Sequence, residues 1–255
     1  MKNKLIVIKI GGKIISNNNL FNFLIQKIQK INENIVLVHG GGNIASEYFK
    51  TNNLPVKMIN GRRITDKLTL DKLVMLYAGS INKNLVSKLS KINKKYIGLS
   101  GIDGKVITSK KREIKDIDYG FVGDIEKIDG DLLSLLINNK IYPVISPITA
   151  DKKGNLLNTN ADTIATMISI EMSKYYDVNL FYCFDKEGVM NNNEVINKIN
   201  HECYLKLLAN NQIKDGMIPK LENSFKALKN GVKSVHIGDI NIFNDLKNTT
   251  EICLS

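Results

Sequence analysis

The residues best suited to chemistry in this chain are a lysine and two glycines that follow an apolar run near the N-terminus. The sequence reads LIVI at residues 5–8 and then KIGG at residues 9–12. A short apolar run of this kind predicts a buried strand. Glycine has no Cβ, so another group can approach its backbone N–H closely. A lysine beside two such N–H groups suits a bound phosphate.

A second glycine-rich turn follows thirty residues later. The apolar run IVLV at residues 35–38 leads into HGGGN at residues 39–43, and Asn43 is suited to cap a helix that follows. If both runs are strands of one parallel sheet, both turns lie at its carboxyl edge, where open α/β sheets bind ligands. One turn would then hold a phosphate and the other its acceptor.

Lys220 is a further candidate, because it stands directly after Pro219. Proline is typical of the first turn of a helix, which places this lysine at the positive end of the helix dipole. A cation is disfavoured there unless an anion is bound. An ordinary solvated lysine explains the position equally well, so Lys220 indicates an anion site only together with other motifs.

Two other functions fit parts of the sequence. Residues 40–45 (GGGNIA) match the G-x-G-x-x-A fingerprint of dinucleotide-binding loops, which makes a nicotinamide-dependent oxidoreductase the remote alternative. That fingerprint expects an acidic residue about 20 positions later, where this chain has NGRR at residues 60–63. The formal net charge of +11 would suit nucleic-acid binding. The basic residues are scattered, however, and the chain has no Trp for base stacking, so we expect no nucleic-acid partner.

Length and composition narrow the class of protein. A chain of 255 residues is long enough for a large core and for two lobes. Its three cysteines form no C-x-x-C pair, which indicates neither a disulfide framework nor a zinc site. No apolar run approaches the roughly 18 residues of a membrane span, and no signal-peptide pattern is present. We therefore expect a cytoplasmic protein with no membrane partner.

The remaining pattern alternates strands with helices, which predicts an α/β fold. Apolar residues at helical spacing over residues 20–31 complete a strand–helix–strand unit and imply a parallel sheet. A long helical stretch is expected over residues 66–91, with Thr65 or Asp66 as its N-cap. Pro143 predicts that the strand at residues 141–145 lies at an edge or a bulge. Further helices are expected at 163–172, 201–210 and 219–230, further strands at 96–99, 178–184 and 234–237, and a hairpin within 105–128.

Five motifs in one order make the chain resemble the amino acid kinase family, and within it the N-acetylglutamate kinases. One such motif would be weak, whereas these five span nearly the whole chain. The resemblance implies a three-layer αβα sandwich around one continuous, mostly parallel, eight-stranded sheet. It also implies an N-acyl-glutamate-binding lobe at residues 1–173 and a nucleotide-binding lobe at residues 174–255. The motifs are KIGG at 9–12, HGGG at 39–42, NGRRIT at 60–65, NTNAD at 158–162 and DGMIPK at 215–220.

The activity implied by the resemblance is ATP-dependent phosphorylation of N-acetyl-L-glutamate on its γ-carboxylate, giving N-acetyl-L-glutamyl 5-phosphate in arginine biosynthesis. A Glu-like carboxylate with a pKa near about 4.3 is ionised at pH 7 and is itself the nucleophile, so no catalytic base is required. Catalysis then consists of holding two anions in line and neutralising the charge on the transferring phosphoryl group. Mg²⁺ is expected to enter with ATP, held mainly by the nucleotide phosphates, with no protein metal site.

The resemblance also assigns roles to individual residues. Lys9 and Lys220 would contact the phosphoryl oxygens, and Asp162 would orient the two lysines. Gly11 and Gly12 would donate backbone N–H groups at the nucleotide phosphate. The acyl-glutamate would be bound by Gly41, Gly42, Arg63 and Asn158, and the nucleotide loop would contain Asp185, Gly188, Val189 and Met190, although Lys186 and Glu187 depart from the apolar residues usual there.

Two properties stay open at this point. Arg62 stands where the better-known acetylglutamate kinases have an apolar residue, directly before the arginine that aligns with Arg63. Neighbouring side chains on an extended segment face opposite sides, so Arg62 is either a solvated residue or, if the loop turns it inward, one that favours N-succinyl-L-glutamate, the alternative substrate. Because the first strand starts after three residues, the N-terminal helix of hexameric, arginine-inhibited relatives has no room. We therefore expect a homodimer insensitive to arginine.

Overall fold

The computed structural model describes most of the chain, and none of the helices that it describes is long and apolar enough to cross a membrane. Two motif residues, Asn60 and Asp215, lie outside the described residues. The described ranges are residues 2–59, 61–91, 93–192, 194–213, 216–243, 246 and 249–255.

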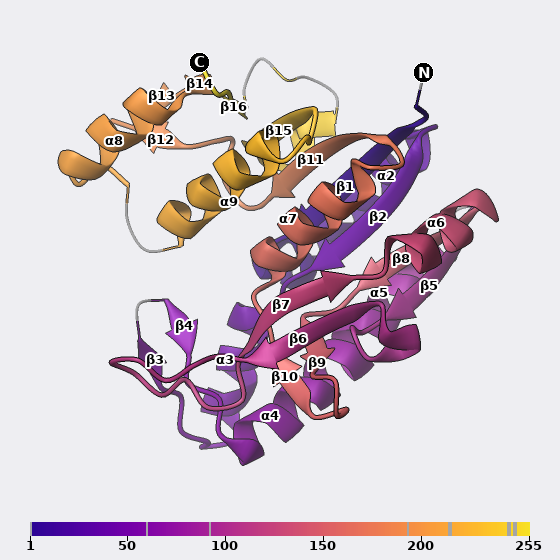
Figure 1. Cartoon of the computed structure of the whole chain (residues 1–255), viewed down its shortest axis with the longest axis vertical. Coiled ribbons are helices and arrows are strands. Elements are labelled where there is room, and N and C mark those ends of the chain that lie inside the picture. Colours follow the sequence, from indigo (N-terminus) through magenta and orange to yellow (C-terminus); the bar gives the residue numbers. More distant parts are fainter. Residues whose placement is uncertain are drawn as a thin grey trace.

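One eight-stranded sheet runs through the molecule in the order β14-β16-β15-β11-β1-β2-β8-β5 (Figure 1). Its six parallel strands are joined by two that run the other way, since β16 pairs antiparallel to β15 and parallel to β14. The expected continuous, mostly parallel sheet is therefore confirmed. The strands are β1 (Lys4–Ile10), β2 (Asn34–His39), β5 (Lys95–Leu99), β8 (Ile141–Ile145), β11 (Asp177–Cys183), β14 (Lys198–Ile199), β15 (Ser234–Gly238) and β16 (Thr250–Ile252).

Strand β1 lies at the centre of the sheet, between β2 and β11. Its side chains alternate between two hydrophobic cores, with Leu5 and Val7 in one and Ile8 and Ile10 in the other. Both faces are buried, which is why the strand reads as an unbroken apolar run. Because β1 and β2 are parallel neighbours, the two glycine-rich turns that follow them lie side by side at the carboxyl edge, as the sequence predicts.

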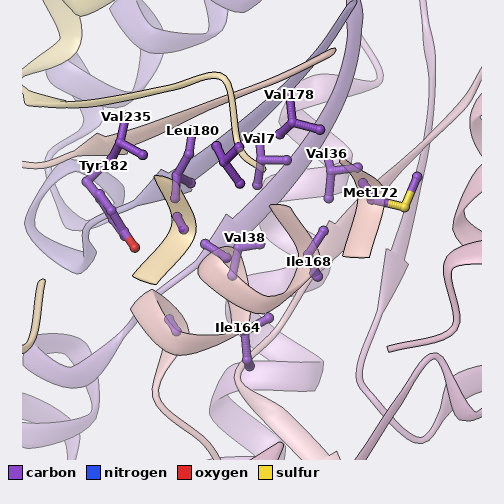
Figure 2. Close-up of a cluster of buried hydrophobic side chains, with 14 of the residues drawn as sticks. Val7, Val36, Val38, Ile164, Ile168, Met172, Val178, Leu180, Tyr182 and Val235 are labelled. Carbon is purple, nitrogen blue, oxygen red and sulfur yellow. The ribbon is translucent and has the colours of Figure 1, made fainter. Parts of the chain in front are cut away.

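Helices cover both faces of the sheet and complete the three-layer sandwich. Figure 2 shows the first core, where Val7, Val36 and Leu180 of three neighbouring strands lie against Ile164 and Ile168 of a helix. That face is covered by α6 (Gly130–Asn138), α7 (Ala161–Met172), α8 (His201–Ala209) and α9 (Met217–Lys229). The opposite face is covered by α1 (Gly12–Ser16), α2 (Asn18–Lys30), α3 (Gly42–Thr51), α4 (Lys67–Val74) and α5 (Asn82–Leu89).

Smaller sheets lie beyond the carboxyl ends of β1 and β2 (Figure 1). A four-stranded sheet in the order β10-β9-β6-β7 contains the hairpin expected within residues 105–128. Beside it, β3 and β4 form a two-stranded hairpin. The bounds are β3 (Met58–Ile59), β4 (Arg62–Arg63), β6 (Ile107–Lys111), β7 (Gly123–Ile128), β9 (Ile148–Ala150), β10 (Leu156–Asn158) and, in a separate hairpin, β12 (Met190–Asn191) with β13 (Glu194–Val195).

Two local predictions had different outcomes: one is confirmed and the other is wrong. The long helix after residue 66 is present with Asp66 as its N-cap, accepting a hydrogen bond from the Thr69 N–H at 2.7 Å, although a π-helical segment at Met75–Ile81 separates α4 from α5. The edge or bulge expected from Pro143 is wrong, because β8 lies inside the sheet between β2 and β5 and its register with β5 is unbroken from Ile141 to Ile145. Its pairing with β2 begins only at Val144, so the proline precedes that ladder.

Candidate active site

A cavity of about 640 Å³ opens at the carboxyl ends of β1, β2 and β11. Residues from all five sequence motifs line it, which brings together segments far apart in the chain. Cations outnumber carboxylates three to one in this lining, a distribution that attracts anionic ligands. The charged lining residues are Lys9, Lys13, Arg62, Arg63, Arg112 and Lys220, with Asp162 and Asp185.

Asp162 holds two lysines at the centre of the cavity. It lies in the first turn of α7, whose N-cap Asn160 accepts a hydrogen bond from the Thr163 N–H. Its Oδ1 is 2.9 Å from Lys9 Nζ at the end of β1, and its Oδ2 is 2.9 Å from Lys220 Nζ in the first turn of α9. The structure thus brings together three residues that the sequence separates by about 210 positions.

The electrostatics of this cluster leave it with one cation in excess. Burial alone would raise the pKa of Asp162, but the charges of Lys220 and Lys9 outweigh it and hold that pKa well below its usual range. Burial lowers the pKa of Lys220. The negative charge of Asp162 raises that pKa, and the positive charge of Lys9 lowers it further. Lys220 Nζ also lies 4.8 Å from the centroid of the Tyr182 ring. Two cations that share one carboxylate, one of them buried, are suited to an anion that supplies the missing charge.

The first glycine turn differs in one respect from the expectation. The Gly11 N–H is not free to contact a phosphate, because it donates to the Cys183 carbonyl at 2.8 Å and so ties β1 to β11. That expected role of Gly11 is corrected. Gly12 is the first residue of α1, where a backbone N–H has no intrahelical acceptor. A Cβ at Gly12 would lie 1.9 Å from Asn43 Oδ1, so glycine lets the two turns meet.

The second turn leads to Arg63, which is only 7% exposed. Its Nη2 donates to the Gly42 carbonyl at 3.1 Å and to Ser46 Oγ at 2.7 Å. Its Nη1 is buried and has no hydrogen-bond partner among the described residues. A buried guanidinium with an unused donor suits a ligand carboxylate, which arginine binds through two parallel hydrogen bonds.

Gly41, Gly42 and Asn158 line the same cavity as Arg63. A Cβ at Gly41 would lie 2.8 Å from Ile81 Cδ1, so α3 begins in close contact with the helix behind it. A Cβ at Gly42 would meet no described atom within 4 Å. Asn158 Nδ2 donates to Thr65 Oγ1 at 3.0 Å, which fixes the amide beside the strand that carries Arg63. The four expected acyl-glutamate residues therefore lie together.

The four expected nucleotide-loop residues separate into two groups. Asp185 lines the cavity and pairs with Lys13, with Nζ and Oδ2 2.8 Å apart. Gly188 and Val189 are buried, and the Val189 N–H donates to Thr250 Oγ1 at 2.8 Å. Met190 begins the hairpin β12–β13. These last three residues do not line the cavity that the described residues form.

Sequence reasoning missed two residues of the cavity that bear on its chemistry. Ser46, which receives the Arg63 hydrogen bond, stands four residues after Gly42 in α3, and helical spacing would have placed both on one face. Arg112 belongs to no motif, and only the fold of the β6–β7 hairpin brings it here. No cluster of three His, Cys, Asp or Glu side chains suited to a metal ion occurs among the described residues.

Comparison with known proteins places these observations in a family. The amino acid kinase family matches residues 4–239. The acetylglutamate kinase of Bacteroides fragilis is 48% identical over 241 residues, covering 93% of this chain and 92% of that protein. The acetylglutamate kinase of Phocaeicola vulgatus is 46% identical, covering 93% and 94%. The crystal structure of smu.665 from Streptococcus mutans UA159 is 30% identical with a TM-score of 0.85, covering 98% of this chain and 99% of that one.

Proposed function

This chain belongs to the amino acid kinase family, and from that premise we propose that it is an ATP-dependent kinase of N-acylated glutamate. It would transfer the γ-phosphoryl group of MgATP to the γ-carboxylate of N-acetyl-L-glutamate, a step of arginine biosynthesis in the cytoplasm. The names of the relatives support this acceptor. The observation that carries the proposal is a single cavity that holds the Lys9–Asp162–Lys220 cluster and, apart from it, the buried Arg63.

The acceptor end of the cavity binds the amino-acid part of the substrate in this proposal. Arg63 takes the α-carboxylate, which supplies the acceptor that its Nη1 lacks. Asn158 and the turn at Gly41 and Gly42 position the acyl amide. The γ-carboxylate then extends toward Lys9 and Lys220. Since that carboxylate is ionised near neutral pH, the site needs no general base.

The phosphoryl end stabilises charge in the transition state. Lys9 and Lys220 neutralise the oxygens of the transferring group, and the Gly12 N–H donates a further hydrogen bond. Asp162 keeps both lysine side chains in place without reacting itself. Mg²⁺ would enter with ATP as part of the substrate and offset the charge of its phosphates, while Asp162 stays paired with the two lysines.

The nucleotide would approach from the carboxyl end of β11 in this proposal. Asp185 follows that strand directly, and its pair with Lys13 links the strand to α1. Gly188, Val189 and Met190 would act indirectly, by fixing the loop and the hairpin behind it. Residues 1–173 would form the acyl-glutamate lobe and residues 174–255 the nucleotide lobe. The expected homodimer stays a prediction, which light scattering tests.

The oxidoreductase alternative loses its support in the structure. The first N–H of the loop at residues 40–42 is occupied, since the Gly40 N–H donates to the Ile10 carbonyl at 2.8 Å. That Gly40 N–H is therefore not available to a pyrophosphate. The family match favours phosphoryl transfer as well.

A direct assay tests the proposed function. The protein is incubated with MgATP and N-acetyl-L-glutamate, and the acyl phosphate is trapped with hydroxylamine as a hydroxamate. We expect ADP and hydroxamate in equal amounts, and thermal stabilisation by MgATP but not by NAD(H) or an oligonucleotide. Stabilisation by NAD(H) alone, with no ADP formed from any N-acylated glutamate, would contradict the proposal.

A further inference from the structure

Arg112 lies in the cavity without a role in the mechanism above. It directly follows β6, and its backbone N–H donates to the Val122 carbonyl at 2.8 Å. Val122 forms a parallel bridge with Asn158, and both line the cavity. Arg112 is therefore tied through Val122 to the acceptor end, on the side where Asn158 would hold the acyl amide.

The Arg112 guanidinium is held in a fixed orientation with one donor unused. Its Nε lies 3.2 Å from each carboxylate oxygen of Asp124, and its Nη2 lies 2.5 Å from Asp124 Oδ1. The group also lies 5.5 Å from the centroid of the Tyr119 ring. Nη1 is buried and has no hydrogen-bond partner among the described residues. A ligand oxygen would satisfy this donor.

Arg62 adds a second cation to this side of the cavity. It lies next to Arg63 in β4, and both residues line the same cavity. Arg62 is exposed and pairs with no carboxylate among the described residues. Arg63 likewise has no carboxylate partner among the described residues. The remaining cations of the cavity are paired: Lys9 and Lys220 with Asp162, Lys13 with Asp185, and Arg112 with Asp124.

The charges of the substrate do not account for both of these arginines. N-acetyl-L-glutamate has two carboxylates, of which the γ group is assigned to Lys9 and Lys220 and the α group to Arg63. Its acetyl group is neutral and leaves Arg62 without an anion and the Arg112 Nη1 without an acceptor. An acyl chain that ends in its own carboxylate would leave the α-nitrogen beside Asn158 and carry a third anion toward Val122 and Arg112.

We infer that Arg112 and Arg62 form a subsite for the terminal carboxylate of a dicarboxylic acyl group, and that the acceptor is N-succinyl-L-glutamate in preference to N-acetyl-L-glutamate. This inference rests on the proposed kinase function. The reaction itself is unchanged, because the γ-carboxylate still receives the phosphoryl group. The Asp124 carboxylate positions Arg112 and does not contact the substrate.

Three acceptors test whether the acyl charge is recognised. We would measure kcat/KM with saturating MgATP for N-succinyl-L-glutamate, for N-acetyl-L-glutamate, and for the uncharged terminal amide N-succinamoyl-L-glutamate. A charge-assisted hydrogen bond predicts that the succinyl substrate exceeds both others by about tenfold or more. Equal use of the succinyl and succinamoyl compounds would overturn the inference, because chain length alone would then explain the preference.

Variants locate the recognition in the two arginines. Arg112→Gln and Arg62→Gln should each reduce the succinyl-to-acetyl ratio of kcat/KM by about tenfold. Lys127→Gln is the matched control, since Lys127 is an exposed cation in the same hairpin and does not line the cavity. It should leave the ratio unchanged. Arg112→Gln removes the Arg112–Asp124 pair and could destabilise the hairpin. Arg62 is exposed, so Arg62→Gln still tests the inference in that case.

The outcomes separate this inference from the proposed function. Phosphorylation of N-acetyl-L-glutamate with a succinyl-to-acetyl ratio below one in the native protein, unchanged in both arginine variants, would overturn the acyl subsite and leave the kinase in place. Phosphorylation of neither acyl-glutamate, in a protein that hydrolyses or binds MgATP, would overturn the proposed function instead.

Discussion

At the scale of single residues, the carboxylate of Asp162 determines the behaviour of two lysines. Without this carboxylate, Lys220 would be an isolated buried cation, which is costly unless it is paired. The shared carboxylate keeps both in place, and the remaining positive charge is available to a phosphoryl group. The three residues thus act as a unit, and substitutions among them need not be additive.

Removing either lysine should affect turnover more than acceptor binding. We expect Lys9→Ala and Lys220→Ala each to lower kcat by about 10²–10³, or about 2.7–4 kcal/mol, if they act as transition-state donors. The KM for N-acyl-glutamate should change much less, because Arg63 is untouched. Lys4→Ala is the matched control, since Lys4 is an exposed lysine in the same strand. Unchanged turnover in Lys9→Ala would refute the role of the lysine.

Replacing Asp162 should shift the pH dependence of turnover. The Asp162 carboxylate opposes the lowering of the pKa of Lys220 by burial. In Asp162→Asn that support is lost, so the pKa falls further and Lys220 loses its proton at a lower pH. We expect the alkaline limb of the kcat–pH profile to move to lower pH. At pH values below that limb, the loss of kcat should be smaller than in Lys9→Ala.

A comparison with Asp185→Asn makes this prediction specific. Asp185 also pairs with a lysine of the cavity, but that lysine is exposed. Asp185→Asn should leave the alkaline limb of the kcat–pH profile in place. If both aspartate variants shifted the limb equally, a general loss of negative charge would explain the effect, and the link between Asp162 and Lys220 would fail.

At the scale of elements, the start of α3 shows how closely the site depends on packing. Gly41 lies against the π-helical segment, whereas its neighbour Gly42 faces open space. Two adjacent glycines therefore have different reasons to be glycine. One allows two helices to approach, and the other leaves room for a ligand.

Alanine at each of these glycines should separate stability from binding. In Gly41→Ala the new Cβ would lie 2.8 Å from Ile81 Cδ1 and 2.9 Å from Tyr77 Cε1. We expect a loss of about 1–3 kcal/mol from overpacking, measured as the free energy of unfolding in urea. Gly42→Ala should keep its stability and raise the KM for N-acyl-glutamate. Equal stability of the two variants would contradict the close packing of α3.

The N-cap of the long helix offers a test of stability alone. Asp66 accepts the Thr69 N–H at 2.7 Å and does not line the cavity. Asp66→Ala should reduce the free energy of unfolding by about 1 kcal/mol. Asp71→Ala in the same helix removes an exposed pair with Lys67 and should cost about 0.2–0.5 kcal/mol. A larger loss from Asp71→Ala than from Asp66→Ala would refute the importance of the cap.

At the scale of the whole molecule, positive charge is both scattered along the chain and concentrated in the cavity. Most of the formal charge of +11 is carried by scattered lysines. The cavity, in contrast, gathers six cations against two carboxylates at one edge of the sheet. Cavity walls of low dielectric focus such a field and raise the local concentration of anionic substrates.

Salt should therefore weaken substrate capture more than turnover. We expect kcat/KM for N-acyl-glutamate to fall as ionic strength rises from about 0.01 M to about 0.15 M, where the screening length shortens from about 30 to about 8 Å. The value of kcat should change less, because buried charges are screened less. Arg62→Gln should make the salt dependence shallower. A kcat/KM that is independent of salt would contradict electrostatic capture by the cavity.

The sequence by itself determined the local features of this protein. Apolar runs followed by glycine turns identified β1 and β2, and their parallel arrangement followed from the helical pattern between them. Asp66 and Pro219 marked helix starts that the structure contains, because caps and first turns depend on neighbouring residues. The order of five motifs was sufficient to indicate the family.

Only the tertiary structure decided which groups meet. The partner of the Gly11 N–H is a carbonyl of β11, about 170 residues away, and no local pattern specifies that register. The interior place of Pro143 depends on where the ladder with β2 begins. The presence of Arg112 in the cavity follows from the pairing of β6 with β7. Such contacts depend on how strands distant in sequence align, since side-chain periodicity fixes the face of a strand but not its neighbour.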